Sequence, residues 1–374
     1  MINLSKIKDF LIEKNYEKAP KGTNPYIEIG DINLENNTYK IKEKASVSGA
    51  VYANKGDIIV STVRPTRGAI AIIKEDKIAV SNAFAVLTFD EKKCSNEFIK
   101  YILLSKKFLK YLGKHSTGAT YPTCSKEDII DYEIELPELN VQLKFIDELN
   151  NLNKYIELKH NIMNDLDKLI KNKMELLLKK SNKKIPLSEY ITSLTAGKSL
   201  AGVIENENKV LKSGAVTFDN FNQNDYKFLP LDYTPNTEHL VNVGDVIISR
   251  MNTEDLVGAA AYVWNVLPSS YLPDRLWRAN INKEQASAIF VWQLLVHRTT
   301  KKRIKSIATG TSGTMKNISK TNLLNLNGPL VKKNDQEEFS KYCSNVYELK
   351  FLIEEEIKNI HLMINNKINL AIKK

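Results

Sequence analysis

The sequence predicts an α+β protein in which two similar mixed α/β globules are separated by two long helices that form an antiparallel coiled coil. Three observations predict this fold. The phrase GDIIVSTVRPTRGAIAII, which begins at Gly56, returns as GDVIISRMNTEDLVGAAAYV from Gly244. The features that follow each phrase recur in the same order, and each set ends in a long polar stretch with apolar residues at heptad spacing. A repeat of this length is a domain and not a solenoid unit.

The order of features after each phrase defines the parts of the chain. A helix-like stretch comes first, then a loop rich in Thr and Gly, and then a proline followed by a glutamine, which are Pro137 and Gln142 or Pro329 and Gln336. At 374 residues the chain exceeds the usual size of one core, so at least two domains are expected. We place the boundaries at 1–140 for the first globule, 141–184 for the first long helix, 185–332 for the second globule and 333–374 for the second long helix.

Within the first globule, apolar runs predict strands and one amphipathic stretch predicts a helix. The helix is expected over 97–112, with Phe98, Ile102, Leu109 and Leu112 on one face. A short helix or strand is expected over 4–14, and strands are expected over 26–32, 57–63, 69–73, 84–89 and 129–136.

The second globule repeats this plan with longer insertions. Strands are expected over 246–249 and 259–264, and the counterpart helix over 289–304. The insertions fall around 206–224 and 253–272. Different loops on a shared scaffold predict two different specificities.

Heptad spacing in the long helices predicts that each packs against a partner helix. The economical partner is the other long helix of the same chain, although a self-associating dimer would leave the same pattern. Forty helical residues reach about 60 Å, so a pair of this length is expected to hold the globules at a fixed distance. The predicted interface positions are Leu149, Ile156, Met163, Ile170 and Leu177 in the first helix, and Val346, Ile353, Ile357, Ile360 and Ile364 in the second.

The charge balance suggests a nucleic-acid partner, and the position of the arginines strengthens the suggestion. The formal net charge is +10, which a Lys-, Asn- and Ile-rich composition could also produce without a ligand. All seven arginines lie in the globules, whereas the long helices carry only lysine. Arginine forms paired hydrogen bonds with guanine edges and phosphates, so recognition is expected in the globules.

Other sequence features argue against a membrane, a disulfide framework or a metal site. No run of about 18 apolar residues occurs, and the charged N-terminus MINLSKIKDFLIEK lacks the apolar core of a secretory signal. A cytoplasmic location is therefore expected. The three cysteines, Cys94, Cys124 and Cys343, are too scattered for a disulfide framework or a zinc site.

No catalytic motif stands up to inspection. The stretch 194–199, LTAGKS, resembles the end of a phosphate loop, but Thr192 stands where the first glycine belongs. Asn24-Pro25-Tyr26 lacks a second aromatic residue, and Pro273-Asp274 lacks a following Glu-X-Lys, so a turn and a loop explain them better. No catalytic residue is expected in this chain.

Four features together resemble the specificity (S) subunit of type I restriction-modification systems. They are the two repeated phrases, the Thr-Gly loops STGATYPTCSKEDI and ATGTSGTMKNISKTNL, the proline and glutamine that lead into each long helix, and the duplicated layout. The resemblance covers essentially the whole chain. The second copy departs from the usual strand-proline-leucine-proline ending at Gly328-Pro329-Leu330-Val331, and ELPEL in the first copy departs to a lesser degree.

The resemblance implies a non-catalytic reader of double-stranded DNA. Each globule would be a target recognition domain for one half of a bipartite target, with an unspecified gap that the helices set. Two methyltransferase (M) subunits would dock around the coiled coil, and restriction/translocase (R) subunits would join them. S-adenosylmethionine, ATP and Mg would belong to these partners, and this chain would hold no cofactor.

Candidate DNA-binding residues divide into those that position phosphates and those that read bases. The phosphate candidates are Lys114, Lys126, Lys316, Lys320, Thr117, Thr120, Thr311 and Thr314, and the base-reading candidates are Arg64, Arg67, Arg250, Asn252, Arg275 and Arg278. For each residue the alternative is a surface ion pair or a structural anchor. The alternatives for the whole chain are a coiled-coil scaffold with duplicated protein-binding globules and the recognition part of a stand-alone restriction or modification enzyme.

Overall fold

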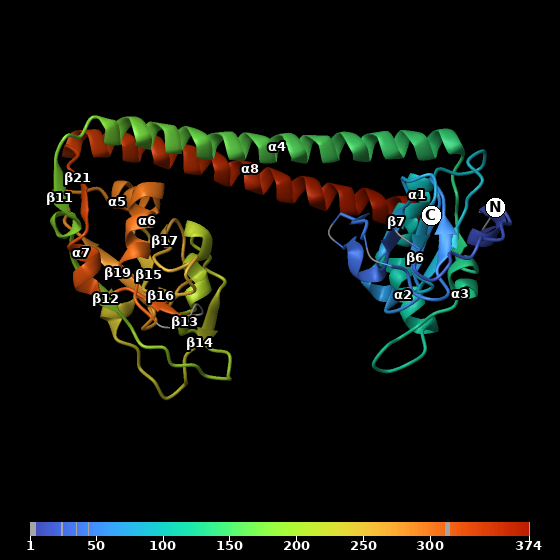
Figure 1. The fold of residues 1–374 in the computed structure, drawn as a ribbon, viewed down its shortest axis with the longest axis horizontal. Coiled ribbons are helices and arrows are strands. Elements are labelled where there is room, and N and C mark those ends of the chain that lie inside the picture. The colour runs from blue at the N-terminus through green and yellow to red at the C-terminus, as the bar shows by residue number, and fades with distance from the viewer. Residues whose placement is uncertain (1–4, 24, 35, 44, 311–314, 374) are drawn as a thin grey trace. The chain divides into compact units, whose positions relative to one another are not determined.

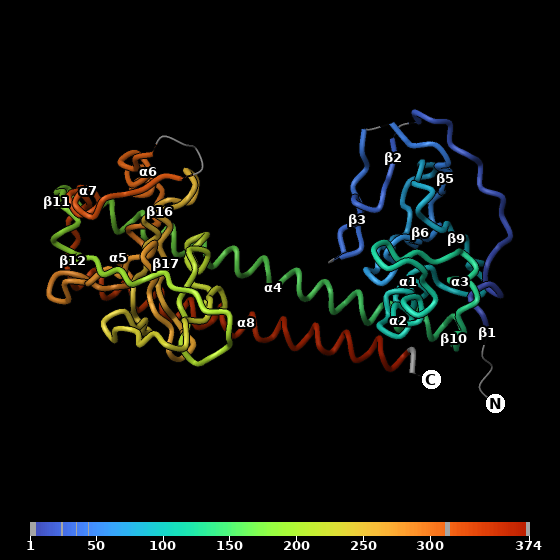
Figure 2. The backbone as a smooth tube through the Cα atoms, turned by 90° about the horizontal axis from the view of Figure 1, so that it is seen from below, coloured from blue at the N-terminus to red at the C-terminus, as the bar shows by residue number. Residues whose placement is uncertain are grey.

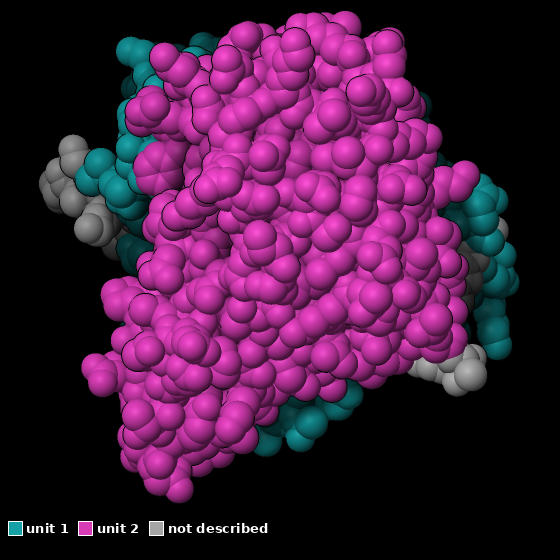
Figure 3. All heavy atoms as spheres, turned by 90° about the vertical axis from the view of Figure 1, so that its left-hand side faces the viewer, with its two compact units in different colours: residues 1–160, 354–374 teal, residues 161–353 magenta. Residues whose placement is uncertain are grey.

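The computed structural model describes residues 5–23, 25–34, 36–43, 45–310 and 315–373, and the chain falls into two compact units (Figure 3). Unit 1 comprises Met1–His160 with Glu354–Lys374, and unit 2 comprises Asn161–Ile353. The long helices α4 (Leu139–Lys179) and α8 (Lys333–Lys373) each contribute to both units (Figure 1). Helix α4 starts two residues before the expected boundary at 141 and ends five residues before the expected 184, and α8 starts at the expected 333.

Unit 1 contains two three-stranded sheets, and Figure 2 labels β6 (Ile58–Ser61) and β9 (Phe84–Leu87) of the first and β2 (Tyr26–Ile27) and β5 (Val51–Ala53) of the second. In the first sheet, β6 lies between β7 (Ile70–Ile72) and β9, and both pairings are antiparallel. All four residues of β6 and of β9 are buried, as continuous apolar strands require. The second sheet has the order β2, β8 (Ile78–Val80), β5, and β3 (Ile32–Asn33) pairs with β4 (Thr38–Tyr39) beside it.

The prediction of one helix over 97–112 is wrong, because the stretch forms two helices, α1 (Asn96–Leu103) and α2 (Lys106–His115). The hydroxyl of Ser105 accepts a hydrogen bond from the Phe108 amide at 3.1 Å and begins the second helix. This capping bond replaces the helical hydrogen bonds that would have continued α1.

The prediction of a strand over 129–136 is only partly right. Helix α3 (Lys126–Ile130) occupies its start, and only β10 (Glu133–Ile134) is extended. Strand β10 pairs antiparallel with β1 (Ser5–Lys6), which is followed by the short 3₁₀ helix η1 (Ile7–Phe10).

Unit 2 is built on a four-stranded sheet with the order β12 (Ile191–Ala196), β19 (Leu276–Ile281), β15 (Val246–Ser249), β17 (Ala260–Tyr262). Strands β15 and β17 confirm the two strands predicted here. A smaller sheet joins β13 (Lys209–Leu211) to β14 (Tyr226–Phe228) and β18 (Ser270–Tyr271), and β11 (Lys184–Pro186) pairs with β21 (Asn327–Pro329).

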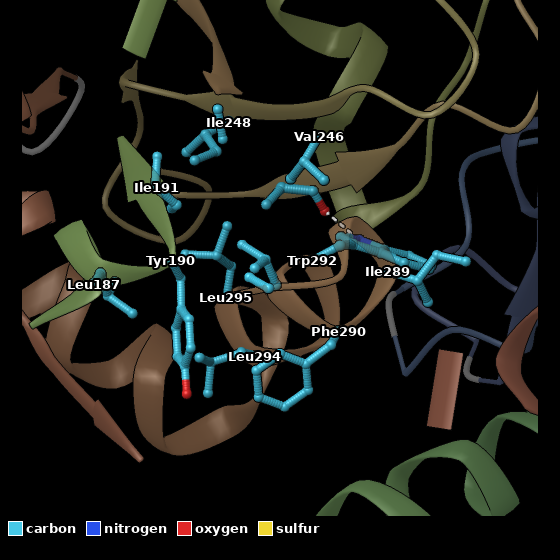
Figure 4. Close-up of a cluster of buried hydrophobic side chains, with 14 of the residues drawn as sticks. Leu187, Tyr190, Ile191, Val246, Ile248, Ile289, Phe290, Trp292, Leu294 and Leu295 are labelled. Atoms are coloured by element: carbon cyan, nitrogen blue, oxygen red, sulfur yellow. Dashed lines mark hydrogen bonds between the residues drawn. The ribbon is translucent and has the colours of Figure 1, made fainter. Parts of the chain in front are cut away.

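Helices complete the core of unit 2. The helix predicted over 289–304 is again two helices, α5 (Ala288–Val296) and α6 (Arg298–Ser306), because His297 has an extended ψ of 134°. Helix α7 (Lys320–Leu324) follows the Thr-Gly loop. In the core, the indole of Trp292 donates a hydrogen bond to the Ala260 carbonyl, and Tyr190, Phe290 and Leu294 lie nearby (Figure 4).

Matching hydrogen bonds show that the two globules repeat one fold. The amide of Gly56 donates to the Ile73 carbonyl at 2.9 Å, and the amide of Gly244 donates to Val263 at the same distance. Both glycines have a left-handed φ, 90° and 95°, which explains why the repeated phrase begins with this residue type. The carboxylate of Asp57 accepts from the Asn54 amide, as Asp245 accepts from Asn242.

The predicted heptad positions form the packed face of the long helices. Among them only Met163 is half-buried, and the others are buried: Leu149, Ile156, Ile170 and Leu177 in α4, and Val346, Ile353, Ile357, Ile360 and Ile364 in α8. In unit 2 several of these side chains share one core with Tyr190 and Phe290 of the globule. The helix pair is therefore part of the folded unit and not an appendage.

Ion pairs fix the direction in which the helices pack. The pairs within unit 1 are Glu148–Lys367 and Lys159–Glu356, and those within unit 2 are Asp167–Lys350 and Lys173–Glu338. Residue numbers fall along α8 as they rise along α4, so the two helices of one chain pack antiparallel, as predicted. None of the helices in the described ranges is long and apolar enough to cross a membrane.

Candidate nucleic-acid interface

In unit 1, Arg64 is held in place by the loop that carries the Thr-Gly sequence. Its backbone has a left-handed φ of 49°, which is uncommon for a residue with a side chain, and its amide donates to the Pro122 carbonyl at 2.7 Å. The guanidinium lies 4.4 Å from the ring centre of Tyr121 and reaches the Thr120 carbonyl at 3.5 Å. The cation is therefore oriented before any ligand arrives.

The Thr-Gly loop is closed by the backbone of Thr117 and Thr123, which exchange two hydrogen bonds of 2.9 Å. At Gly118 the φ is 98°, and a Cβ would lie 2.9 Å from the Tyr121 carbonyl oxygen, so only glycine fits this turn. The side chains of Thr117 and Thr120 are exposed. Tyr121 is 64% exposed although it is a large aromatic residue, and no local signal in the sequence marks it as a site residue.

Two further candidates in unit 1 lie near this loop, and a third lies elsewhere. Arg67 is exposed at the end of the turn that Arg64 begins, and Lys114 is exposed in the last turn of α2. A Cβ at Gly113, next to Lys114, would lie 3.0 Å from Thr66 of that turn, so the two segments adjoin. Lys126 begins α3, where its Nζ lies 5.3 Å from the ring centre of Tyr16.

In unit 2, the candidates gather where β15 and β19 meet. Arg250 directly follows β15, and its amide donates to the Arg275 carbonyl at 3.1 Å. Its guanidinium lies 5.8 Å from the ring centre of Trp277, and its Nε is buried without a hydrogen-bond partner. Asn252 in β16 (Met251–Asn252) is paired with Lys316 in β20 (Lys316–Asn317). The structure therefore brings Arg250, Asn252, Arg275 and Lys316 together.

A cavity of ≈ 380 Å³ opens beside Arg275. It is also lined by Lys212, Lys227 and Asp274, and the carboxylate of Asp274 accepts a hydrogen bond from Ser199. Lys227 is exposed, and it was missed because nothing in the local sequence distinguishes it from other lysines. A polar cavity with cations at its wall suits a phosphate.

Arg278 has partners within the globule, which favours the alternative of a structural anchor over base reading. Its two terminal nitrogens donate to the carbonyls of Leu240 and Glu238 at 2.9 and 2.8 Å, and it faces Asp245 at 3.8 Å. Burial raises the pKa of Asp245, and the Asn242 amide and Arg278 oppose this rise. A guanidinium with all these partners would lose them on turning toward a base.

The remaining candidates of unit 2 are Lys316, Lys320, Thr311 and Thr314. The Nζ of Lys320 donates to the Leu194 carbonyl at 2.6 Å, and the Nζ of Lys316 donates to Gly310 at 3.1 Å. Both therefore have partners within the chain. Thr311 and Thr314 lie outside the described residues.

Neither the carboxylates nor the cysteines form a metal centre in the described part of the chain. No group of three or more His, Cys, Asp or Glu side chains that could hold a metal occurs there. Cys94, Cys124 and Cys343 are free and buried. Burial raises the pKa of Cys94 to about 12 and that of Cys124 to about 11, so both thiols are protonated at neutral pH.

Comparison with known proteins identifies the first half of the chain directly. Residues 3–168 match the type I restriction modification DNA specificity domain. The chain is 30% identical over 128 residues to the type I restriction enzyme MjaVIII specificity subunit of Methanocaldococcus jannaschii, covering 33% of this chain and 30% of that protein. It is 26% identical over 119 residues to the HindI specificity subunit of Haemophilus influenzae, covering 31% and 26%. The aligned stretches thus span less than a third of these relatives.

Solved structures extend the likeness to the whole fold. A chain from a structure of the type I R-M system, concerned with complex assembly and conformational transition, has a TM-score of 0.64 at 16% identity, covering 99% of this chain and 97% of that chain. The S subunit of the type I restriction-modification system from M. genitalium has a TM-score of 0.53 at 14% identity, with coverage of 99% and 96%. The chain therefore carries a type I restriction modification DNA specificity domain over residues 3–168, is similar to specificity subunits over about a third of its length, and has the fold of these solved chains.

Proposed function

We propose that this chain is the non-catalytic DNA-specificity subunit of a type I restriction-modification complex and that it recognises a bipartite double-stranded target, one half-site per globule. The observation that carries the proposal is the repeated strand end. In each globule an oriented arginine follows the strand that comes after the Gly-Asp pair: Arg64, three residues after β6, lies beside Tyr121 in unit 1, and Arg250, directly after β15, lies over Trp277 in unit 2. The loops around these arginines differ between the copies, as two different half-sites require.

Base reading and phosphate positioning fall to different side chains in this proposal. Arg64, Arg67, Arg250 and Arg275, with Asn252, are the base readers, and Tyr121 adds an exposed ring that could stack on a sugar or base. The phosphate-binding group contains Lys114, Lys126, Lys227, Lys316, Thr117 and Thr120, and Lys320, Thr311 and Thr314 stay in it as predictions. Arg278 is left out because its hydrogen bonds are already made within the globule.

The outer face of the long helices supports docking of two M subunits. Tyr155, Ile162, Leu169 and Leu176 repeat at heptad spacing along α4, yet they are 36 to 61% exposed. On α8, Leu349, Leu352, Met363 and Leu370 are exposed as well. A second apolar stripe on a helix that already has a packed face is expected to bind another protein. In this proposal M and R subunits bring S-adenosylmethionine, ATP and Mg to cytoplasmic DNA.

A selection experiment tests the proposal. The chain, purified in complex with its methyltransferase partner, is incubated with a pool of random DNA duplexes, and the bound duplexes are sequenced. We expect enrichment of a split motif, two short defined sequences separated by a gap of fixed length. Enrichment of no sequence, or of one continuous motif, would overturn the proposal and favour the protein-binding scaffold.

A further inference from the structure

A buried glutamine joins the first globule to the first long helix. Gln142 lies in the first turn of α4 and is fully buried. Its Oε1 accepts a hydrogen bond from the Ser95 amide at 2.9 Å, and its Nε2 donates to the carbonyls of Pro137 at 2.7 Å and Lys93 at 3.4 Å. Ser95 is the residue at which α1 begins. One side chain therefore links α4, the start of α1 and the segment that leads into α4.

The same arrangement is built a second time in unit 2. Gln336 lies in the first turn of α8 and is also fully buried. Its Oε1 accepts from the amide of Ser287, where α5 begins, at 3.1 Å. Its Nε2 donates to the Val331 carbonyl at 2.8 Å and to the Gln285 carbonyl at 3.0 Å. Two independent globules thus place the same amide at the same junction.

Only a primary amide of this length satisfies all three partners, because it offers one acceptor and two donors. A glutamate could accept from the serine amide but would bring its charge against two carbonyl oxygens. A methionine would fill the space and leave one amide and two carbonyls without partners in a buried site. The requirement explains why the sequence repeats a glutamine after the proline in both halves.

An aromatic residue three positions later adds an apolar contact on the same helix face. Phe145 packs edge-on against Phe98 of α1, with ring centres 5.4 Å apart. Phe339 is 1% exposed within the core of unit 2. Residues three apart share one face of a helix, so the amide and the ring hold the same side of each long helix against its globule.

The junction of unit 2 has additional polar contacts. The hydroxyls of Ser287 and Ser340 lie 2.6 Å apart, and Lys333 donates to the carbonyls of Lys283 and Ala286 at 2.7 and 2.8 Å. The corresponding position to Ser340 in unit 1 is Ile146, which makes no such bond through its side chain. Unit 1 therefore depends more heavily on its single glutamine.

We propose that Gln142 and Gln336 are positioning residues that fix each recognition globule in one orientation on its long helix and so restrict the complex to one gap length between the half-sites. The inference rests on the proposed function. Neither glutamine is expected to touch DNA, because both are fully buried. Loss of either should therefore alter the spacing that is tolerated and leave the two half-site sequences unchanged.

The test uses the complete complex with its methyltransferase partner and a duplex library in which the two selected half-sites are constant and the gap varies. For the wild type we expect one preferred gap. In Gln142→Met we expect the preference over gaps one base pair longer or shorter to fall by about tenfold, as loss of a buried hydrogen-bond network predicts. Gln336→Met should show the same change with a smaller amplitude, because its junction keeps the serine and lysine contacts.

Ile129→Val is the control, since it removes buried volume from the core of unit 1 but none of the hydrogen bonds of the junction, and it should lower the melting temperature without widening the gap preference. If Gln142→Met does not assemble, Gln336→Met carries the test. A variant that assembles and keeps the wild-type gap preference, or that changes a half-site sequence, overturns the inference. A wild-type complex that enriches no split motif defeats the proposed function itself, which is a distinguishable result.

Discussion

Arg275 and Arg278 lie three residues apart near the start of β19, yet their surroundings give them opposite roles. The Arg275 side chain is exposed beside a polar cavity, whereas Arg278 makes two hydrogen bonds to carbonyls and faces Asp245. Sequence alone could not separate them, because the carbonyls that Arg278 binds belong to a loop about forty residues earlier. Exposure and hydrogen-bond partners, and not residue type, therefore distinguish the two guanidinium groups.

This difference predicts separate outcomes for two matched substitutions. Arg275→Ala should weaken discrimination at the second half-site by about 1 to 3 kcal/mol, the worth of one good base contact, and leave the first half-site and the melting temperature unchanged. Arg278→Ala should lower the stability of unit 2 by about 1 to 3 kcal/mol, because it removes the hydrogen bonds to the Leu240 and Glu238 carbonyls and the charge that faces Asp245. Binding selection and thermal denaturation of both variants measure the two effects. Equal behaviour of the two variants would contradict the assignment.

At the scale of elements, short-range signals decided where the predictions succeeded and failed. The repeated strands could be predicted because a continuous apolar run bounded by glycine and turn residues is typical of a buried strand. Apolar spacing continues across the breaks at Ser105 and His297, so it predicts a single helix in each case. The break at Ser105 comes from a local capping hydrogen bond, which apolar spacing does not reveal. The capping box of α3 was a signal that could have been used, since Ser125 and Asp128 have the required spacing and exchange hydrogen bonds.

The heptad positions predict the packed face of α4, but they do not reveal that a second apolar stripe on the same helix stays exposed. Leu169 and Leu176 are 50% and 61% exposed, which leaves them free for a partner. Leu169→Glu with Leu176→Glu should therefore reduce capture of the methyltransferase partner by at least about tenfold without lowering the melting temperature of the chain alone. Co-purification and thermal denaturation provide the measurements.

Lys168→Glu is the matched control for this pair, because Lys168 is exposed on the same helix and pairs with Asp165 one turn earlier. It introduces a similar negative charge outside the apolar stripe. Undiminished capture by the double variant, or equal loss in the control, would mean that the stripe is not where the partner binds.

At the scale of the whole molecule, the continuous helices α4 and α8 connect the units, so their length should limit the gap between half-sites. Deletion of residues 154–160 together with 355–361 removes one heptad from each helix and takes out both partners of the Lys159–Glu356 pair. Seven residues are about 10 Å of helix, or on the order of three base pairs of duplex. The preferred gap should shorten by up to that amount, while both half-site sequences are retained.

Gap selection with the deleted chain in its complex measures the change. Deletion of 154–160 alone is the control, because it shifts the register of the remaining ion pairs and should impair assembly. An unaltered gap in the double deletion would show that helix length does not set the spacing.

The buried thiols have a practical consequence for watching this molecule at work. Because Cys94, Cys124 and Cys343 are buried and their pKa values are raised, they should react slowly with maleimide dyes at neutral pH. Cysteines introduced at the exposed positions Lys107 and Asp232 could then be labelled selectively, with the native sequence otherwise intact. Energy transfer between the two dyes would report the separation of the two globules as duplexes of different gap length are added.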